Sequence, residues 1–135
     1  MVGVLTGRAF AAEQRNGITQ PQAASRENFM ARAFEMRRLA IARGDQAYGA
    51  VVVKDGRIIG EGISAVVTNN DPTAHAEMQA IRDAIRRFGA HEVKGAELFG
   101  TSRACSMCER GAYQAGIDLM VYGESATEAG APRIR

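Results

Sequence analysis

The sequence predicts a three-layer α/β/α domain around a central mixed sheet. Apolar residues at helical spacing alternate with short β-branched runs along residues 25–122. An Asp-Gly pair between two such runs, at residues 55–56, indicates an antiparallel hairpin. A strand, helix and strand in succession over residues 96–122 indicate a parallel crossover. The two kinds of pairing together predict a mixed sheet covered on both faces by helices.

The bulk composition is that of one globular domain. The chain has 135 residues, of which 46% are hydrophobic and 24% charged. We expect residues 1–24 to form an N-terminal extension and residues 25–135 a single domain. No apolar run is long enough to span a bilayer and no leader pattern is present, so we expect a cytoplasmic protein. The formal charge of +2 is small for a dedicated nucleic-acid binder.

Helix signals flank the first half of the chain. Ser25 can cap a first helix that ends near Gly44. The hairpin follows, with strands around residues 50–53 and 58–59. Asp71 and the proline after it predict the start of a second helix, which runs to about residue 89.

The second half predicts a further strand, helix and strand. Residues 96–101 are typical of a strand, residues 106–115 of a helix closed by Gly116, and residues 118–122 of a last strand.

Few residues can hold a transition metal. The chain contains only His75, His91, Cys105 and Cys108 besides its carboxylates. The two cysteines, three residues apart at the start of a helix, can project from one face, where the helix dipole favours thiolates. His75 lies near the start of the preceding helix, and the two helix starts can meet at one edge of the sheet. His91 is better explained as a solvated loop residue.

Two thiolates and one imidazole would leave the fourth zinc position to water, as in catalytic sites. Glu77, two residues after His75, could then accept a proton from that water and return it to the substrate. A Cys-x-x-Cys pair alone is as typical of redox proteins as of metal sites, so a redox pair stays an alternative.

Three segments together resemble the cytidine deaminase-like superfamily. They are NDPTAHAE at residues 70–77, YGAVVVKDG at residues 48–56 and CSMC at residues 105–108. Within the superfamily the chain is most similar to bacterial guanine deaminases, over about residues 45 to 123.

The resemblance implies one zinc ion held by His75, Cys105 and Cys108, with Glu77 as proton shuttle. It also implies a pocket for a flat ring, with Tyr48 packing on the substrate, and a homodimer or higher homo-oligomer. The residues that we expect to contact the substrate are Tyr48, Gly49, Ala50, Ser64, Asn70, Ala76 and Arg103.

Three positions depart from the usual pattern of these deaminases. Ala104 replaces a proline, Arg103 replaces a common glutamate, and Ser64 stands where an asparagine usually binds the base. Guanine and tRNA adenosine deaminases also continue well past the last matched strand, so we expect elements that close their pockets to be missing here.

The sequence therefore predicts a zinc-dependent hydrolytic deaminase. We expect zinc-bound hydroxide to replace an exocyclic amine on a small amino-heterocycle, such as a guanine- or cytosine-like nucleobase. An editing deaminase that acts on adenosine or cytidine in tRNA or other nucleic acid is the alternative, and a non-catalytic zinc or redox protein on the same scaffold is a further one. Neither a nucleic-acid partner nor a membrane is expected.

Overall fold

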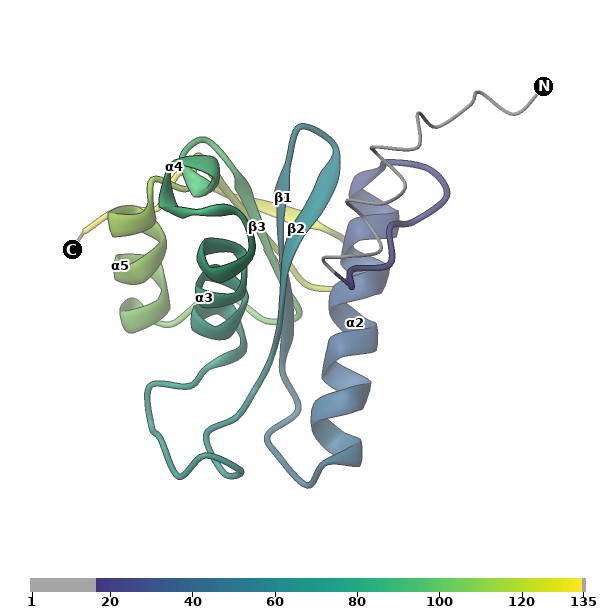
Figure 1. Cartoon of the computed structure of the whole chain (residues 1–135), viewed down its shortest axis with the longest axis vertical. Coiled ribbons are helices and arrows are strands. Elements are labelled where there is room, and N and C mark those ends of the chain that lie inside the picture. Colours follow the sequence, from purple (N-terminus) through teal and green to yellow (C-terminus); the bar gives the residue numbers. More distant parts are fainter. Residues whose placement is uncertain (1–16, 135) are drawn as a thin grey trace.

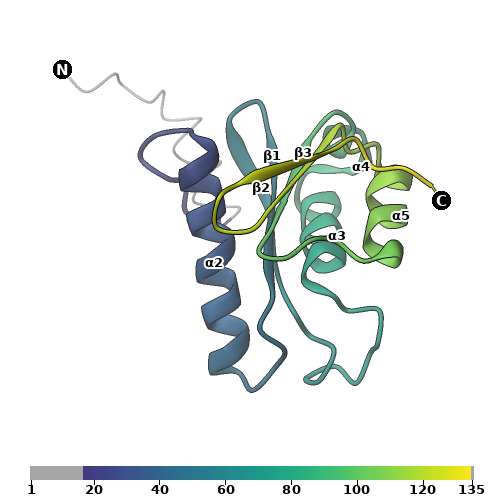
Figure 2. The ribbon, with the colours of Figure 1, turned by 180° about the vertical axis from the view of Figure 1, so that it is seen from behind.

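The protein is a five-stranded sheet between two helical layers. A computed structural model describes residues 17–134. The long helix α2 covers one face of the sheet, and α3, α4 and α5 cover the other (Figures 1 and 2). The predicted three-layer α/β/α architecture is therefore confirmed. No helix in this described range is long and apolar enough to cross a membrane.

The elements follow one another in the order expected for such a fold. In chain order they are α2 (Arg26–Ala42), β1 (Gly49–Lys54), β2 (Arg57–Ile63), α3 (Ala76–Phe88), α4 (Ala90–Val93), β3 (Glu97–Gly100), α5 (Ser106–Ala115), β4 (Leu119–Tyr122) and β5 (Thr127–Gly130).

The sheet is mixed, as predicted. Its strand order is β2-β1-β3-β4-β5. Strand β1 is antiparallel to both β2 and β3, whereas β3 and β4 are parallel and are joined through α5. Strand β5 then pairs antiparallel with β4. Because β1 runs against β3, the start of β1 lies beside the end of β3, with Ala50 opposite Gly100.

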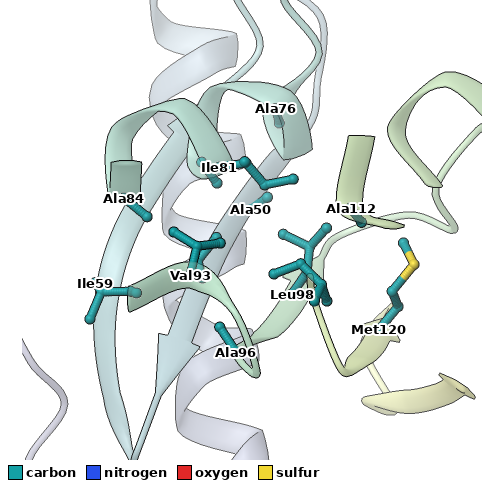
Figure 3. Close-up of a cluster of buried hydrophobic side chains, with 13 residues drawn as sticks. Ala50, Ile59, Ala76, Ile81, Ala84, Val93, Ala96, Leu98, Ala112 and Met120 are labelled. Atoms are coloured by element: carbon teal, nitrogen blue, oxygen red, sulfur yellow. The ribbon is translucent and has the colours of Figure 1, made fainter. Parts of the chain in front are cut away.

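Two hydrophobic clusters hold the layers together. The one between the sheet and α3, α4 and α5 centres on Leu98, Val93 and Ile81 (Figure 3). The one under α2 includes Phe29, whose ring meets that of Phe99 edge-on at 5.6 Å.

The segment before α2 also contacts the domain. Ile18 is buried in the cluster under α2. The side-chain amide of Gln20 donates to the carbonyl of Ile58 and accepts from its N–H, so it pairs with the edge strand β2 as a strand would. Residues 17–24 thus pack against the domain, and most of the expected extension lies outside the described residues.

Local signals explain most element ends. Ser25 caps α2 by accepting a hydrogen bond from the N–H of Asn28. The hairpin turns at Asp55 and Gly56, both with positive φ, as a two-residue Asp-Gly turn requires. Helix α5 ends at Gly116 in the left-handed conformation.

The predicted start of the second helix is wrong. Helix α3 begins at Ala76, not around Pro72, and His75 occupies its N-cap position. Asp71 instead makes a local turn, in which its carboxylate accepts hydrogen bonds from the N–H and the hydroxyl of Thr73. Asp71, which the sequence predicted as the helix cap, therefore organises the loop ahead of the helix. Helix α4 and strand β5 are additions that the sequence did not predict.

Glycines in β2 let α3 lie directly on the sheet. A Cβ added at Gly62 would lie 2.1 Å from the carbonyl oxygen of Ala76 and 2.4 Å from the nitrogen of Ala80. A Cβ at Gly60 would lie 2.4 Å from the carbonyl oxygen of Ala80. Since these are backbone atoms of α3, any larger side chain must push the whole helix away.

Gly62→Ala should therefore lower the free energy of unfolding by about 3 kcal/mol through overpacking. Gly111→Ala in α5 is the matched control, because its Cβ would meet only the flexible end of Met78, and alanine favours a helix by about 1 kcal/mol. Urea unfolding of both variants measures the difference. Equal stability of the two variants would show that the close packing of α3 is not a constraint.

Candidate metal centre

Three ligand atoms converge where two helices begin. His75 is the N-cap residue of α3, Cys105 is the N-cap residue of α5, and Cys108 follows in the first turn of α5. The Nδ1 atom of His75 lies 3.6 Å from the Cys105 sulfur and 3.5 Å from the Cys108 sulfur. All three ligand atoms lie within 4.8 Å of one another, as the sequence predicted.

These separations fit a tetrahedral zinc ion. Zinc binds sulfur at about 2.3 Å and imidazole nitrogen at about 2.0–2.1 Å, which places two tetrahedral ligand atoms of these types about 3.6 Å apart. Within residues 17–134, no fourth histidine, cysteine or carboxylate joins the cluster. The donor set therefore leaves one position open, as catalytic zinc sites do. His91 is 79% exposed and lies apart, beside Glu92.

The thiol of Cys108 is buried, and burial favours its protonated form. Burial raises its pKa well above the usual range, and the nearby Glu77 and Cys105 raise it further. The helix start favours the thiolate, but burial is the largest influence on the pKa of the Cys108 thiol and raises it. A bound cation would displace this proton, whereas a reactive redox thiol requires a low pKa.

Glu77 brings a buried acid to the same place. It is the second residue of α3 and is only 9% exposed. Burial raises the pKa of its carboxyl, while its own backbone N–H, His75 and Cys108 work in the opposite direction. Glu77 lines a cavity of about 350 Å³ together with His75 and Cys105. The cavity is large enough for a small heterocycle.

The rest of the cavity wall combines expected and unexpected residues. Tyr48 and Arg103, two of the residues expected to contact a substrate, line it. Gln46 and Ser102 also line it and were missed. Ser102 follows the carboxyl end of β3, where ligands of α/β sheets gather, and that position was the available signal.

Four other expected contacts lie outside this lining. Gly49 is paired with Thr101, whose hydroxyl accepts from the Gly49 N–H. Ala50 and Ala76 are fully buried in the core. Asn70 is exposed in the loop before α3, with a positive φ. These residues support the cavity wall or its neighbouring loop, and the cavity is lined by others.

Ser64 faces a carboxylate instead of the cavity. Its buried hydroxyl donates to Asp45 at 2.8 Å. Asp45 also accepts from the N–H groups of Gln46, Val67 and Thr68. This carboxylate therefore ties the loop that carries Gln46 to the segment that leads to His75.

Asp45 should make stability depend on pH. Desolvation opposes its ionisation, but the hydrogen bonds from Thr68, Gln46 and Ser64 outweigh that and hold its pKa well below the usual range. Because the folded-state pKa is the lower one, the stabilisation is complete above the unfolded pKa of about 3.9 and is lost as the pH falls below it.

Asp45→Asn should consequently destabilise the protein at neutral pH, and the difference from the wild type should shrink as the pH falls below about 4. Denaturant unfolding at several pH values measures this difference. A difference that stays constant across that pH range would mean that ionised Asp45 does not stabilise the loops.

A family model that describes the cytidine and deoxycytidylate deaminase zinc-binding region matches residues 23–124. The chain belongs to this deaminase family. The matched region contains His75, Cys105 and Cys108, which agrees with the ligand geometry, so the domain binds zinc.

Guanine deaminases and tRNA-specific adenosine deaminases are among the similar proteins. The chain is 44% identical over 82 residues to the guanine deaminase of Bacillus subtilis, covering 61% of this chain and 53% of that protein. It is 35% identical over 97 residues to the tRNA-specific adenosine deaminase of Aquifex aeolicus, covering 72% of this chain and 64% of that protein. The chain thus spans about half to two thirds of the length of these two deaminases.

Solved structures in the deaminase family share the fold. The structure of Bacillus subtilis guanine deaminase superimposes with a TM-score of 0.69 and 37% identity, covering 76% of this chain and 68% of that one. A structure from a study of A-to-I editing by tRNA:A34 deaminases gives the same TM-score and identity, covering 72% and 75%. The cytidine deaminase-like fold is therefore confirmed.

His75→Ala should abolish tight zinc binding, because two thiols alone lack the third ligand. His91→Ala should retain one zinc per chain, because His91 is remote from the cluster. Elemental analysis after dialysis against a weak chelator measures both variants. A His75→Ala protein that still holds one zinc would contradict the ligand assignment.

Proposed function

We propose that this chain is a zinc-dependent hydrolytic deaminase that removes an exocyclic amine from a small amino-heterocycle, such as a guanine- or cytosine-like nucleobase. The observation that carries the proposal is that the Glu77 carboxyl opens into the same cavity as two of the metal ligands, His75 and Cys105. An acid beside an open metal position is the arrangement that hydrolysis requires.

The reaction replaces nitrogen by oxygen at one ring carbon. A zinc ion in an open three-ligand site supplies a water whose pKa is lowered to about 7. The water oxygen bonds to the carbon that carries the amine, the carbon–nitrogen bond breaks, and ammonia and the oxo product leave. The overall change consumes one water and needs no oxidant or reductant.

Glu77 moves the protons in this proposal. Its carboxylate takes one proton from the water and delivers it to the ring nitrogen, and then takes the second proton from the added hydroxyl and gives it to the departing amine. Burial favours the protonated carboxyl and so assists delivery of the proton. Tyr48, which is half exposed in the cavity wall, offers a ring face on which the heterocycle packs.

Glu77→Ala should retain zinc and lower kcat by about 10²–10⁴-fold, the contribution typical of a general acid–base group. Glu92→Ala is the matched control, since Glu92 is an exposed carboxylate of α4 outside the cavity lining. Ammonia release from a panel of amino-heterocycles, with zinc content measured in parallel, tests both variants. A zinc-loaded Glu77→Ala protein that releases ammonia at the parental rate would contradict the proposed role of Glu77 as proton shuttle.

A nucleic-acid substrate is the second candidate. Relatives that are named tRNA-specific adenosine deaminases favour it. A hollow of about 650 Å³ also adjoins the metal cavity, shares Gln46, Tyr48 and Ser102 with it, and includes Arg37. Such a hollow has room for more than a base. Binding of tRNA that weakens steeply with salt, followed by inosine formation, would favour this candidate over a free heterocycle.

A non-catalytic zinc or redox protein is the remaining alternative. A reversible disulfide between Cys105 and Cys108 in the metal-free protein, together with no ammonia release from the zinc protein, would support it. The His75 imidazole nitrogen, which lies 3.6 Å and 3.5 Å from the two sulfurs, favours metal binding over a redox pair.

We also propose that the chain forms a homodimer. Ile85 of α3 and Tyr113 of α5 are large apolar side chains exposed on the same helical layer (Figure 1). Burial of such side chains against a second copy would remove apolar surface from water.

A further inference from the structure

Arg103 is the positively charged residue in the wall of the metal cavity. It lies two residues before Cys105, in the exposed segment between β3 and α5. The cavity wall otherwise consists of the buried acid Glu77, the ligands His75 and Cys105, and the neutral side chains of Gln46, Tyr48 and Ser102. A cation in this wall can contact a group on a substrate that occupies the cavity.

A ring contact restrains the Arg103 side chain. Its guanidinium carbon lies 5.6 Å from the centroid of the Tyr122 ring, and Tyr122 ends β4. Stacking of this kind occupies the face of the guanidinium and leaves N–H groups at its edge for a ligand. The side chain is thus oriented without consuming its hydrogen-bond donors.

Within the described residues, no carboxylate forms an ion pair with Arg103, whereas Arg26, Arg32, Arg86 and Arg87 each pair with one. The helical arginines are in part paired, whereas the one in the cavity wall is held by an aromatic ring alone. Its charge is therefore available to a ligand.

We propose that Arg103 determines substrate specificity by binding an acidic group, a carboxylate or a phosphate, on the amino-heterocycle. This inference rests on the proposed deaminase function and narrows its substrate class. An exposed guanidinium is well hydrated, so a neutral carbonyl gains little there, whereas an anion gains a charge-assisted and often bidentate contact. Gln46 and Ser102 offer neutral donors and acceptors for the ring itself.

The test compares matched pairs of probes that differ in one acidic group. Cytosine and cytosine-5-carboxylic acid form the carboxylate pair, and guanosine and guanosine 5′-monophosphate form the phosphate pair. Calorimetry on the zinc-loaded full chain gives the Kd of each probe, and ammonia release gives kcat and KM where turnover occurs. The variants are Arg103→Ala, Arg103→Lys and Arg103→Glu.

Arg110→Glu is the matched control for charge. Arg110 is an exposed arginine of α5 that lines a different hollow, with Ser106 and Arg133. The Arg110→Glu substitution changes the net charge by the same amount as Arg103→Glu. If residue 103 contacts the substrate, only Arg103→Glu should raise the Kd of the acidic probes. If the charge acts only through the overall field of the protein, both variants should raise this Kd equally.

We expect Arg103→Ala to weaken binding of one or both acidic probes by about tenfold or more, the size of a lost charge-assisted hydrogen bond, and to leave the neutral partners within about twofold. Arg103→Glu should weaken binding of the acidic probe further. Arg103→Lys should retain part of the preference for the acidic probe over its neutral partner. Arg110→Glu should resemble the wild type. For a substrate, the loss should appear in KM and not in kcat.

Two outcomes would overturn the proposal: no preference of the wild type for either acidic probe over its neutral partner, or a preference that Arg103→Glu leaves intact. The probe pair whose acidic member loses affinity in the Arg103 variants identifies the acidic group as a carboxylate or a phosphate. Failure of the deaminase function gives a different result, in which the zinc protein releases no ammonia from any probe while the acidic preference still disappears in Arg103→Glu.

Discussion

The metal centre depends on how closely α3 packs against β2. Gly60 and Gly62 allow helix backbone to touch strand backbone, and this places His75 and Glu77 at a fixed height above the sheet. Helix α5 begins directly after β3, the strand that pairs with β1. Two helix starts therefore meet at one end of the sheet, and their cap positions supply an imidazole and a thiol.

The same arrangement sets the electrostatics of the centre. The Cys108 thiol and the Glu77 carboxyl are both buried, and burial raises the pKa of each. Ionising either group in this place is costly without a compensating cation. A zinc ion compensates the thiolates, and a neighbouring acid whose protonated form is favoured by burial is suited to giving protons away.

Beside the metal centre, several polar side chains of the cavity wall come from loops. Gln46 and Tyr48 precede β1, whereas Ser102 and Arg103 follow β3. Asp45 holds the first of these loops to the segment before α3 through its bond to Ser64. Ser64 therefore contributes to the position of the loop and does not line the cavity.

The sequence by itself determined the layers, the hairpin and the metal ligands. Asp55 and Gly56 favour a two-residue hairpin turn, and Gly116 ends a helix, so these signals lie in the local sequence. The chain contains only two histidines and two cysteines, so residue chemistry left few possible sets of metal ligands. Only the tertiary structure decided that α3 starts at Ala76, that the mostly exposed β5 joins the sheet, and that Ser64 turns to Asp45 while Gln46 lines the cavity. At the start of α3, a local turn between Asp71 and Thr73 competes with capping of the helix. The placing of Ser64 depends on a partner 19 residues away, which no local pattern encodes.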